Sequence, residues 1–415
     1  MLKLYYYAKL GNVLVGPKYP VRIVGVLNLS PESFYPESVA RDLNDAIERA
    51  IRMVNEGADI IDVGGMSTAP YKETYISLEE ELNRVRPVIK ELSKTLEVPI
   101  SIDTRRSRVA EEALKAGAEI VNDTSGFKLD PDMARIVREY NASAIVMAYG
   151  DVSREYDPIV NIRRLIRESL EICMRYDIDL NKIVIDPGIG FFRDTWLPWY
   201  DWDTYVISNL YRLKILGRPI LIGISMKSFI GKILSLEEPR ERLYGSIASE
   251  ALAVFNGADA IRTHNVTPTL HAVRMAEHMR RKIKSYSSMN VSITDITDIW
   301  AIDDIREMLI DLDVDRIGVD IMSGKGVFKI LYISNIPRIL ALVIKQEMLA
   351  VGGDSATPKE TILGGLEPAD ILVFGTINQL NKLISKLKLM RFKILDKYNL
   401  INGPELAKLI ENAIA

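Results

Sequence analysis

The chain has 415 residues, which is enough for a domain of about 250 residues and a second, smaller one. Hydrophobic residues make up 48% of it and charged residues 26%, as in a globular protein and not a disordered one. The net charge of −3 offers no field of one sign to a nucleic acid or an anionic membrane. No stretch approaches the roughly 20 uninterrupted apolar residues of a membrane span.

Two further features indicate the compartment. The single cysteine, Cys173, excludes an intramolecular disulfide and a cysteine-rich metal site. The apolar stretch at the N-terminus is broken by Lys9 and has no small-residue cleavage site, so we do not expect a secretory signal. We expect a cytoplasmic protein.

Residues 21 to about 285 alternate short β-branched apolar runs with longer amphipathic stretches. Residues 1–17 resemble a hairpin around Gly11, which could cover one end of the fold. Two of the amphipathic stretches end in a glycine at the expected helix stop, Gly57 and Gly117. The predicted strands are residues 21–28, 60–65, 99–103, 119–123, 143–148, 182–187, 219–225 and 260–264.

Eight strands separated by helices favour parallel β/α units, and eight is the number that closes a barrel. A doubly wound open sheet is the alternative, but it would usually carry a glycine-rich phosphate turn after its first strand. Here the first strand runs into Asn28-Leu29-Ser30-Pro31. The sequence therefore predicts an α/β fold, with a (β/α)8 TIM barrel over residues 1–285.

The pattern changes after residue 285, where residues 285–290 form a polar linker. Residues 291–415 read as a second, smaller α/β domain. Gly352-Gly353 is interpreted as a helix stop, and residues 323–326 are too short for a phosphate loop. We expect this domain to serve docking or dimerisation. Its strands are predicted at 291–296, 316–321, 327–333 and 371–376, and its helices at 303–312, 337–353, 378–389 and 404–414.

Polar residues end nearly every strand of the predicted barrel, at the edge where barrels of this type collect their catalytic groups. They are Asn28, Asp62, Asp103, Asn122, Asp123, Asp186, Ser225, Lys227, Arg262 and His264. Helix capping accounts for Asp123 and Ser225, but cations gain nothing from the helix N-termini that follow. Carboxylates and amides suit a flat heterocycle rich in N–H groups, whereas Arg, Lys and His suit a phosphate or diphosphate. The combination predicts a phosphate-bearing nitrogen heterocycle as ligand.

Seven motifs in order resemble the signatures of dihydropteroate synthases, between about residues 20 and 280. This family of TIM barrels joins 7,8-dihydropterin-6-methyl diphosphate to p-aminobenzoate, releases diphosphate, and commonly forms homodimers. The resemblance implies a transferase of folate-type cofactor synthesis. The motifs are GVLNLSPESF (25–34), GADIIDVGGMSTAP (57–70), SIDT (101–104), VNDTSG (121–126), IDPGIGF (185–191), GISMKSFIG (223–231) and IRTHNV (261–266).

The same resemblance implies a role for each site residue. Asp103, Asn122, Asp186 and Lys227 would hold the pterin ring, and Phe191 would line its pocket. Asp62 is a further predicted substrate-binding residue. Asn28, Arg262 and His264 would hold the diphosphate, with Mg²⁺ bridging Asn28 and phosphate oxygens. Ser67 and Thr68 would lie on a loop that closes over the reaction centre, and Ser228 would meet an anion on the second substrate. Asp103, Asp186, Lys227, Arg262 and His264 are the implied catalytic residues, because charges placed there oppose those that develop as diphosphate leaves.

The sequence departs from the family where the second substrate would sit. Met66 and Ala69 replace a glutamate and an arginine, Met226 replaces an arginine, and Ala148 replaces a histidine. Phe192-Arg193 stands for Gly-Lys, followed by an aromatic insertion at 194–205. The acceptor could then be p-aminobenzoate or a bulkier arylamine carrying a ribosyl phosphate. Trp196, Trp199 and Trp202 could form a lip for that amine, or could serve only in packing.

Two other functions fit a pterin-binding barrel. One is a pterin-dependent methyltransferase that passes a methyl group to a corrinoid, which needs no diphosphate site. The other is a pterin-binding protein without turnover, which the altered loops would allow. The loop after Asn28, together with Lys227 and the Arg262–His264 segment, favours the synthase.

Overall fold

The computed structural model describes residues 7–32, 35–67, 75–280, 285–288, 291–294 and 302–414. The chain divides into two compact units, Lys3–Asp295 and Ile296–Ala415. Among the described residues, no helix combines the length and the apolar character that crossing a bilayer would require.

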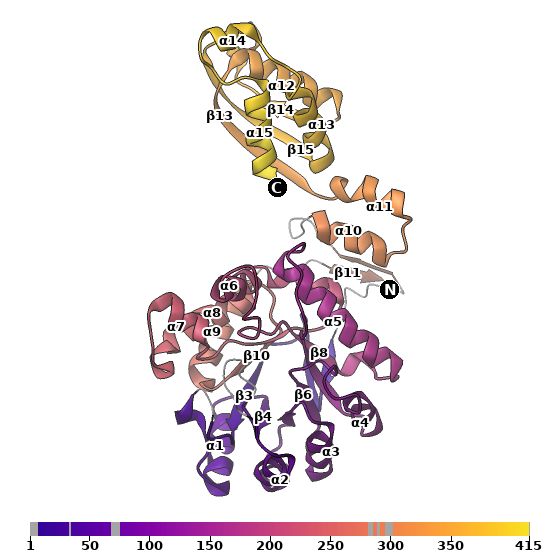
Figure 1. Cartoon of the computed structure of the whole chain (residues 1–415), viewed down its shortest axis with the longest axis vertical. Coiled ribbons are helices and arrows are strands. Elements are labelled where there is room, and N and C mark those ends of the chain that lie inside the picture. Colours follow the sequence, from indigo (N-terminus) through magenta and orange to yellow (C-terminus); the bar gives the residue numbers. More distant parts are fainter. Residues whose placement is uncertain are drawn as a thin grey trace. The chain divides into compact units, whose positions relative to one another are not determined.

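Eight parallel strands form the core of the first unit (Figure 1). Their order is β8-β7-β6-β5-β4-β3-β10-β9, and a parallel bridge between Ile185 and Ile220 joins β8 to the start of β9. The closed barrel is therefore confirmed and the open sheet is excluded. The strands are β3 Arg22–Asn28, β4 Ile60–Gly64, β5 Ile100–Asp103, β6 Ile120–Asp123, β7 Ser143–Met147, β8 Ile183–Asp186, β9 Leu221–Gly223 and β10 Ala260–Thr263.

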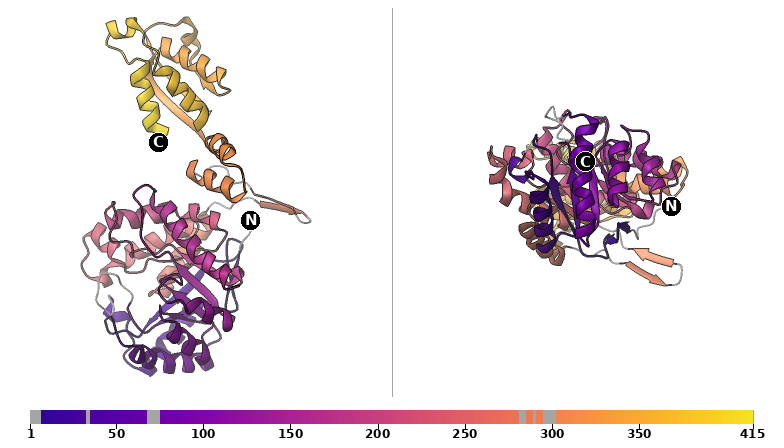
Figure 2. Two further views of the ribbon diagram at one scale, coloured as in Figure 1. Left: turned by 45° about the vertical axis from the view of Figure 1, so that its right-hand side comes forward. Right: turned by 90° about the horizontal axis from the view of Figure 1, so that it is seen from below.

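Helices surround these strands (Figures 1 and 2). Asp42, Ser77 and Asp157 cap three of them by accepting backbone N–H bonds. Gly57 and Gly117 follow two helices at φ values of 106° and 115°, so both predicted stops are confirmed. The helices are α1 Leu43–Asn55, α2 Leu78–Thr95, α3 Ser107–Ala116, α4 Met133–Glu139, α5 Pro158–Arg175, α6 Trp199–Ser208, α7 Ser228–Leu234, α8 Leu243–Phe255 and α9 Val266–Met279.

A hairpin of β1 (Ala8–Leu10) and β2 (Val13–Val15) packs beneath the barrel, as predicted. Its apolar side chains share a buried cluster with residues near the beginnings of the strands, including Ile60, Ile120 and Leu221. The hairpin thus closes the N-terminal end of the barrel. The C-terminal ends of the strands are left as the face for a ligand.

The remaining elements follow α9. A hairpin of β11 and β12 comes first, and the second unit then builds an antiparallel sheet in the order β13-β15-β14 with its own apolar core. The elements are β11 Ser285–Ser288, β12 Val291–Thr294, α10 Ile302–Asp311, α11 Arg316–Met322, β13 Phe328–Pro337, α12 Arg338–Ala350, β14 Asp354–Ala356, β15 Pro368–Thr376, α13 Ile377–Leu387, α14 Lys393–Lys397 and α15 Gly403–Ile414.

Two predictions about this region were wrong. Residues 316–321 were expected to form a strand but lie in α11, because the side chain of Asp315 caps a helical turn by accepting from the Gly318 N–H. Only Val319 of that helix is buried. The segment therefore lacks the burial on both faces that would favour a strand within a sheet. The expected linker at 285–290 contains β11, in which Tyr286 pairs with Ile293.

Candidate functional site

Arg262 lies at the centre of the barrel mouth and ties three strands together. Its Nε donates to Oδ2 of Asp62 at 2.6 Å, and its Nη2 donates to Oδ2 of Asp103 at 2.8 Å. Nδ2 of Asn122 donates to the same Asp62 oxygen at 3.0 Å. Four residues that the sequence analysis placed at strand ends are therefore joined in one hydrogen-bonded network.

Each carboxylate of this network keeps one unsatisfied oxygen. In the part of the chain that the structure describes, Oδ1 of Asp62 and Oδ1 of Asp103 are buried and have no hydrogen-bond partner. Burial raises the pKa of Asp103, while the charge of Arg262 opposes that rise. A buried acceptor without a donor is costly, so these oxygens mark where a ligand with N–H groups gains most.

Asp186 and Lys227 are two further charged residues at the mouth, and the charge of each acts on the other. Oδ1 of Asp186 accepts from the Gly188 N–H at 2.7 Å, and Nζ of Lys227 donates to the Ile189 carbonyl. The Lys227 ammonium lies 5.2 Å from the centroid of the Phe191 ring. Burial lowers the pKa of Lys227 to about 8, although Asp186 and Asp203 oppose the change. The lysine is thus mostly protonated at neutral pH.

His264 is fixed at the end of β10 by Ser225. Oγ of Ser225 lies 3.2 Å from the His264 backbone nitrogen, which donates to it, and 3.1 Å from Nδ1 of the ring. Burial, followed by the charges of Arg262 and Lys227, lowers the pKa of His264 to about 3, so the imidazole is neutral. The prediction that Ser225 caps a helix was wrong, because the N-cap of α7 is Lys227. The same prediction was wrong for Asp123, which accepts from the backbone N–H groups of Ser125 and Phe127 in a turn, whereas the N-cap of α4 is Asp132.

Asn28 faces the first loop. Its Oδ1 accepts from the Ser30 N–H at 3.0 Å and its Nδ2 donates to Ser38 at 3.3 Å. Ser67 is partly exposed after β4, whereas Thr68 lies outside the described residues. Among the residues that are described, no group of three or more His, Cys, Asp or Glu side chains could hold a metal ion.

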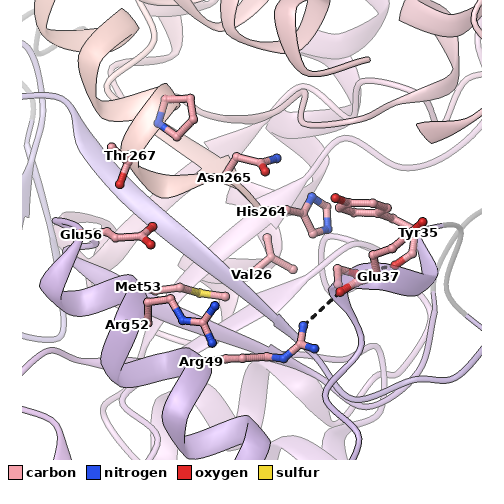
Figure 3. A pocket seen from close by; sticks show the side chains of 12 residues that line it. Val26, Tyr35, Glu37, Arg49, Arg52, Met53, Glu56, His264, Asn265 and Thr267 are labelled. Carbon is pink, nitrogen blue, oxygen red and sulfur yellow. Dashed lines mark hydrogen bonds between the residues drawn. The ribbon is translucent and has the colours of Figure 1, made fainter. Parts of the chain in front are cut away.

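A pocket of about 280 Å³ adjoins His264 on the side of α1 and α9. His264 and Tyr35 lie at one side of it, with the two rings edge to face at 5.4 Å, and Arg52 and Glu56 lie at the other (Figure 3). The sequence analysis did not single out Tyr35 or Arg52. Arg52 belongs to the amphipathic pattern of α1, where a surface arginine is the ordinary interpretation.

Two of the positions that depart from the family are buried. Met226 is 1% exposed and its sulfur lies 3.8 Å from Ser246 Oγ on α8. Ala148 is also 1% exposed. Our expectation that these departures surround the second substrate stays a prediction, since Asp62 of the same site is also fully buried. Met66 is partly exposed, and Ala69 lies outside the described residues.

The three tryptophans of the insertion do not form a common lip. Trp202 is 1% exposed and packs against Phe192 and Trp196, with ring centroids 5.2 and 5.3 Å away. Trp199 instead lies under the guanidinium of Arg193, at 4.0 Å from its ring centroid. Nη2 of Arg193 donates to Oγ of Ser228 at 2.6 Å. The packing interpretation therefore holds for Trp196 and Trp202.

Comparisons with known proteins agree with this geometry. The family model described as "Pterin binding enzyme" matches residues 24–264 and so does not reach the second unit. The dihydropteroate synthase of Clostridium beijerinckii is 37% identical over 261 residues, which cover 63% of this chain and 94% of that protein. That of Bacillus subtilis is 38% identical over 261 residues, covering 63% and 89%.

Solved structures give the same result. The dihydropteroate synthase of Clostridium difficile, determined in the presence of pteroic acid, is 42% identical with a TM-score of 0.59, covering 64% of this chain and 99% of that one. The Xanthomonas albilineans enzyme in complex with 7,8-dihydropteroate is 28% identical with a TM-score of 0.56, covering 66% and 98%.

Proposed function

Because the chain belongs to the dihydropteroate synthase family of pterin-binding enzymes, we propose that it joins 7,8-dihydropterin-6-methyl diphosphate to p-aminobenzoate. It is a transferase of the pterin-methyl group, and its reaction serves folate synthesis. The observation that carries the proposal is the pair of buried, unsatisfied carboxylate oxygens on Asp62 and Asp103, beside the cation that links them.

The pterin ring is assigned to the mouth between β5, β6 and β8. Asp103 offers an unsatisfied Oδ1 to the ring N–H groups, and Asn122 and Asp186 add amide and carboxylate contacts. Lys227 and Phe191 bound the other side of the ring. Asp62 is fully buried, and its Oδ2 accepts from both Asn122 and Arg262. We therefore assign Asp62 to orient those two residues through Oδ2 and to offer its unsatisfied Oδ1 to the ligand.

The diphosphate is assigned to Arg262, His264 and Asn28. Arg262 supplies a permanent charge, and neutral His264 supplies a ring nitrogen fixed by Ser225. Mg²⁺ usually keeps several waters and combines one or two protein oxygens with substrate phosphates. This suits the mouth, whose described residues offer no group of three or more metal-binding side chains. Asn28 would hold the ion through Oδ1, which has a lone pair besides the one used by the Ser30 N–H. The ion would neutralise charge on the departing diphosphate.

The reaction then follows from charge placement. The C–O bond between the pterin methylene and the diphosphate breaks, and its electron pair stays on the diphosphate oxygen. Asp103 and Asp186 lie on the side of the developing positive charge, and Arg262 lies on the side of the developing negative charge. The neutral aryl amine donates its lone pair to the methylene carbon and loses a proton to solvent. An aniline nitrogen needs no strong base for this step.

The acceptor that the site favours is p-aminobenzoate. The lip of three tryptophans that could have held the bulkier ribosyl-phosphate amine is not formed, because Trp202 is buried in the core. The diphosphate assignment also favours a synthase over a corrinoid-linked methyltransferase or a non-catalytic binding protein. Neither of those proteins needs a diphosphate site, so neither would need Arg262, His264 and Asn28 together.

The test supplies the purified full chain with the pterin diphosphate, Mg²⁺ and each amine, and follows diphosphate release and dihydropteroate formation. We expect both products with p-aminobenzoate. Turnover with the glycosylated amine and none with p-aminobenzoate would show that the glycosylated amine is the acceptor. Binding of the pterin diphosphate without release of diphosphate would refute the proposed synthase activity.

Two further expectations are kept as proposals. The resemblance implies a homodimer, and the second unit is proposed to serve docking or dimerisation. Light scattering of the full chain measures the first. A monomer at micromolar concentration would refute it.

A further inference from the structure

We infer that Arg193 selects the acceptor, by requiring an anionic group on the arylamine at the end opposite its amine. The inference rests on the proposed function and names a residue that determines its specificity. Arg193 lies in the loop between β8 and α6, next to the start of α7.

Contacts with Gly190, Ser228 and Trp199 hold the guanidinium of Arg193. Its Nε donates to the Gly190 carbonyl at 2.9 Å and its Nη2 donates to Ser228 Oγ at 2.6 Å. Its Cζ lies 4.0 Å from the centroid of the Trp199 ring, within the range of a cation–π contact. A planar guanidinium held in this way presents its donors in a fixed orientation, as recognition of a carboxylate requires.

Two buried residues of α6 hold the loop that carries Arg193. Asp203 of α6 is buried and accepts from the Gly190 N–H at 2.8 Å. Phe192 packs on Trp202, which is fully inside the core. The aromatic insertion therefore positions Arg193. Trp202 is buried in the core, and Trp199 packs against the guanidinium. Such support fixes a binding group before the ligand arrives.

Positive charge is concentrated around Ser228. Lys227 precedes Ser228 in the chain and lies over Phe191, and the charge of Arg193 contributes to lowering the pKa of Lys227. Two cations thus flank Ser228 from different loops. The amine of the acceptor must reach the pterin methylene near Asp186, so a substituent opposite the amine points away from it, toward Ser228 and Arg193. A carboxylate there gains charge-assisted hydrogen bonds that a neutral amide does not.

The test compares Arg193→Gln with the native chain, using p-aminobenzoate and its neutral analogue 4-aminobenzamide. We expect the KM for p-aminobenzoate to rise roughly tenfold to hundredfold, as for loss of a charged hydrogen bond. The KM for the pterin diphosphate and the KM for 4-aminobenzamide should stay within about twofold of native. Lys232→Gln removes an exposed charge from α7 and serves as the matched control, with no expected change.

A second variant separates charge from geometry. Arg193→Lys keeps the charge but loses the planar fork, so its KM for p-aminobenzoate should fall between those of the native chain and Arg193→Gln. An unchanged KM for p-aminobenzoate, or an equal rise for both acceptors, would overturn the inference alone. Absence of turnover in the native chain would overturn the proposed function, and the inference with it.

Discussion

Glu250 of α8 is linked to β10 through a chain of hydrogen bonds, and its protonation state provides a direct test of this buried contact. The side chain is fully buried, and its Oε2 accepts from Oγ1 of Thr269 at 2.8 Å. Thr269 in turn lies 2.8 Å from Oγ1 of Thr263, the residue between Arg262 and His264. Burial raises the pKa of Glu250 from 4.5 to about 7, against the opposing effect of the threonine hydroxyls.

The sign and size of the effect follow from this shift. Between pH 4.5 and about 7 the folded chain keeps the Glu250 proton while the unfolded chain loses it. The stability contributed by the neutral acid is therefore complete below about pH 4.5 and is lost as pH rises to about 7. At about 1.4 kcal/mol for each pKa unit, the free energy of unfolding falls by about 3 kcal/mol over this pH range. Glu250→Gln keeps an acceptor for Thr269 and cannot ionise, so it lacks this loss.

The assay is denaturant unfolding of both chains at pH 5 and pH 8, followed by tryptophan fluorescence. Three of the four tryptophans lie at 196–202, within the barrel unit. Subtracting the two chains cancels the other titrating groups. We expect the variant to gain about 2–3 kcal/mol on the native chain between pH 5 and pH 8. Parallel pH dependences would refute the assignment of a neutral buried acid.

The remaining predictions concern turnover. Arg262→Gln should lower kcat/KM about 100-fold or more, because it removes the charge beside the leaving group and unpairs Asp62 and Asp103; steady-state diphosphate release measures this. The kcat/KM for the pterin diphosphate should fall about tenfold per unit above pH 8, as Lys227 loses its proton, and Lys227→Arg should lack that limb. Chelation should abolish turnover and added Mg²⁺ should restore it; full activity in excess chelator would contradict the metal assignment.

The barrel and the position of its site could be predicted because both follow from local patterns. Eight β-branched runs alternate with amphipathic stretches, and parallel strands bring their C-terminal ends to one edge. Polar residues such as Asp103 and Arg262, where apolar strands end, are therefore neighbours in space whatever the intervening loops do.

Contacts between loops could not be predicted, because they leave no periodic signal. Ser225 follows a strand and so resembles a helix cap, yet its hydroxyl meets His264 from the neighbouring strand. Met226 adopts a φ of 58°, and its side chain contacts Ser246 of α8. Arg193 contacts Ser228, which lies 35 positions further along the chain, and it immediately precedes the aromatic insertion at 194–205.

Glu250 illustrates a related limit. A glutamate in a helical pattern is ordinarily a surface residue, and only the packed structure shows that this one is enclosed behind β10. The same holds for residues 316–321, whose β-branched composition favours a strand although a capping aspartate starts a helix there.

Binding of the pterin diphosphate is the most direct measurement of the central claim, that a pterin ring occupies the mouth at Asp103. Calorimetric titration into the native chain and into Asp103→Asn isolates this carboxylate, since asparagine has nearly the same shape. We expect saturable binding by the native chain and at least tenfold weaker binding by the variant, as for loss of a charged hydrogen bond. Equal affinity of the two chains would contradict the placement of the pterin ring.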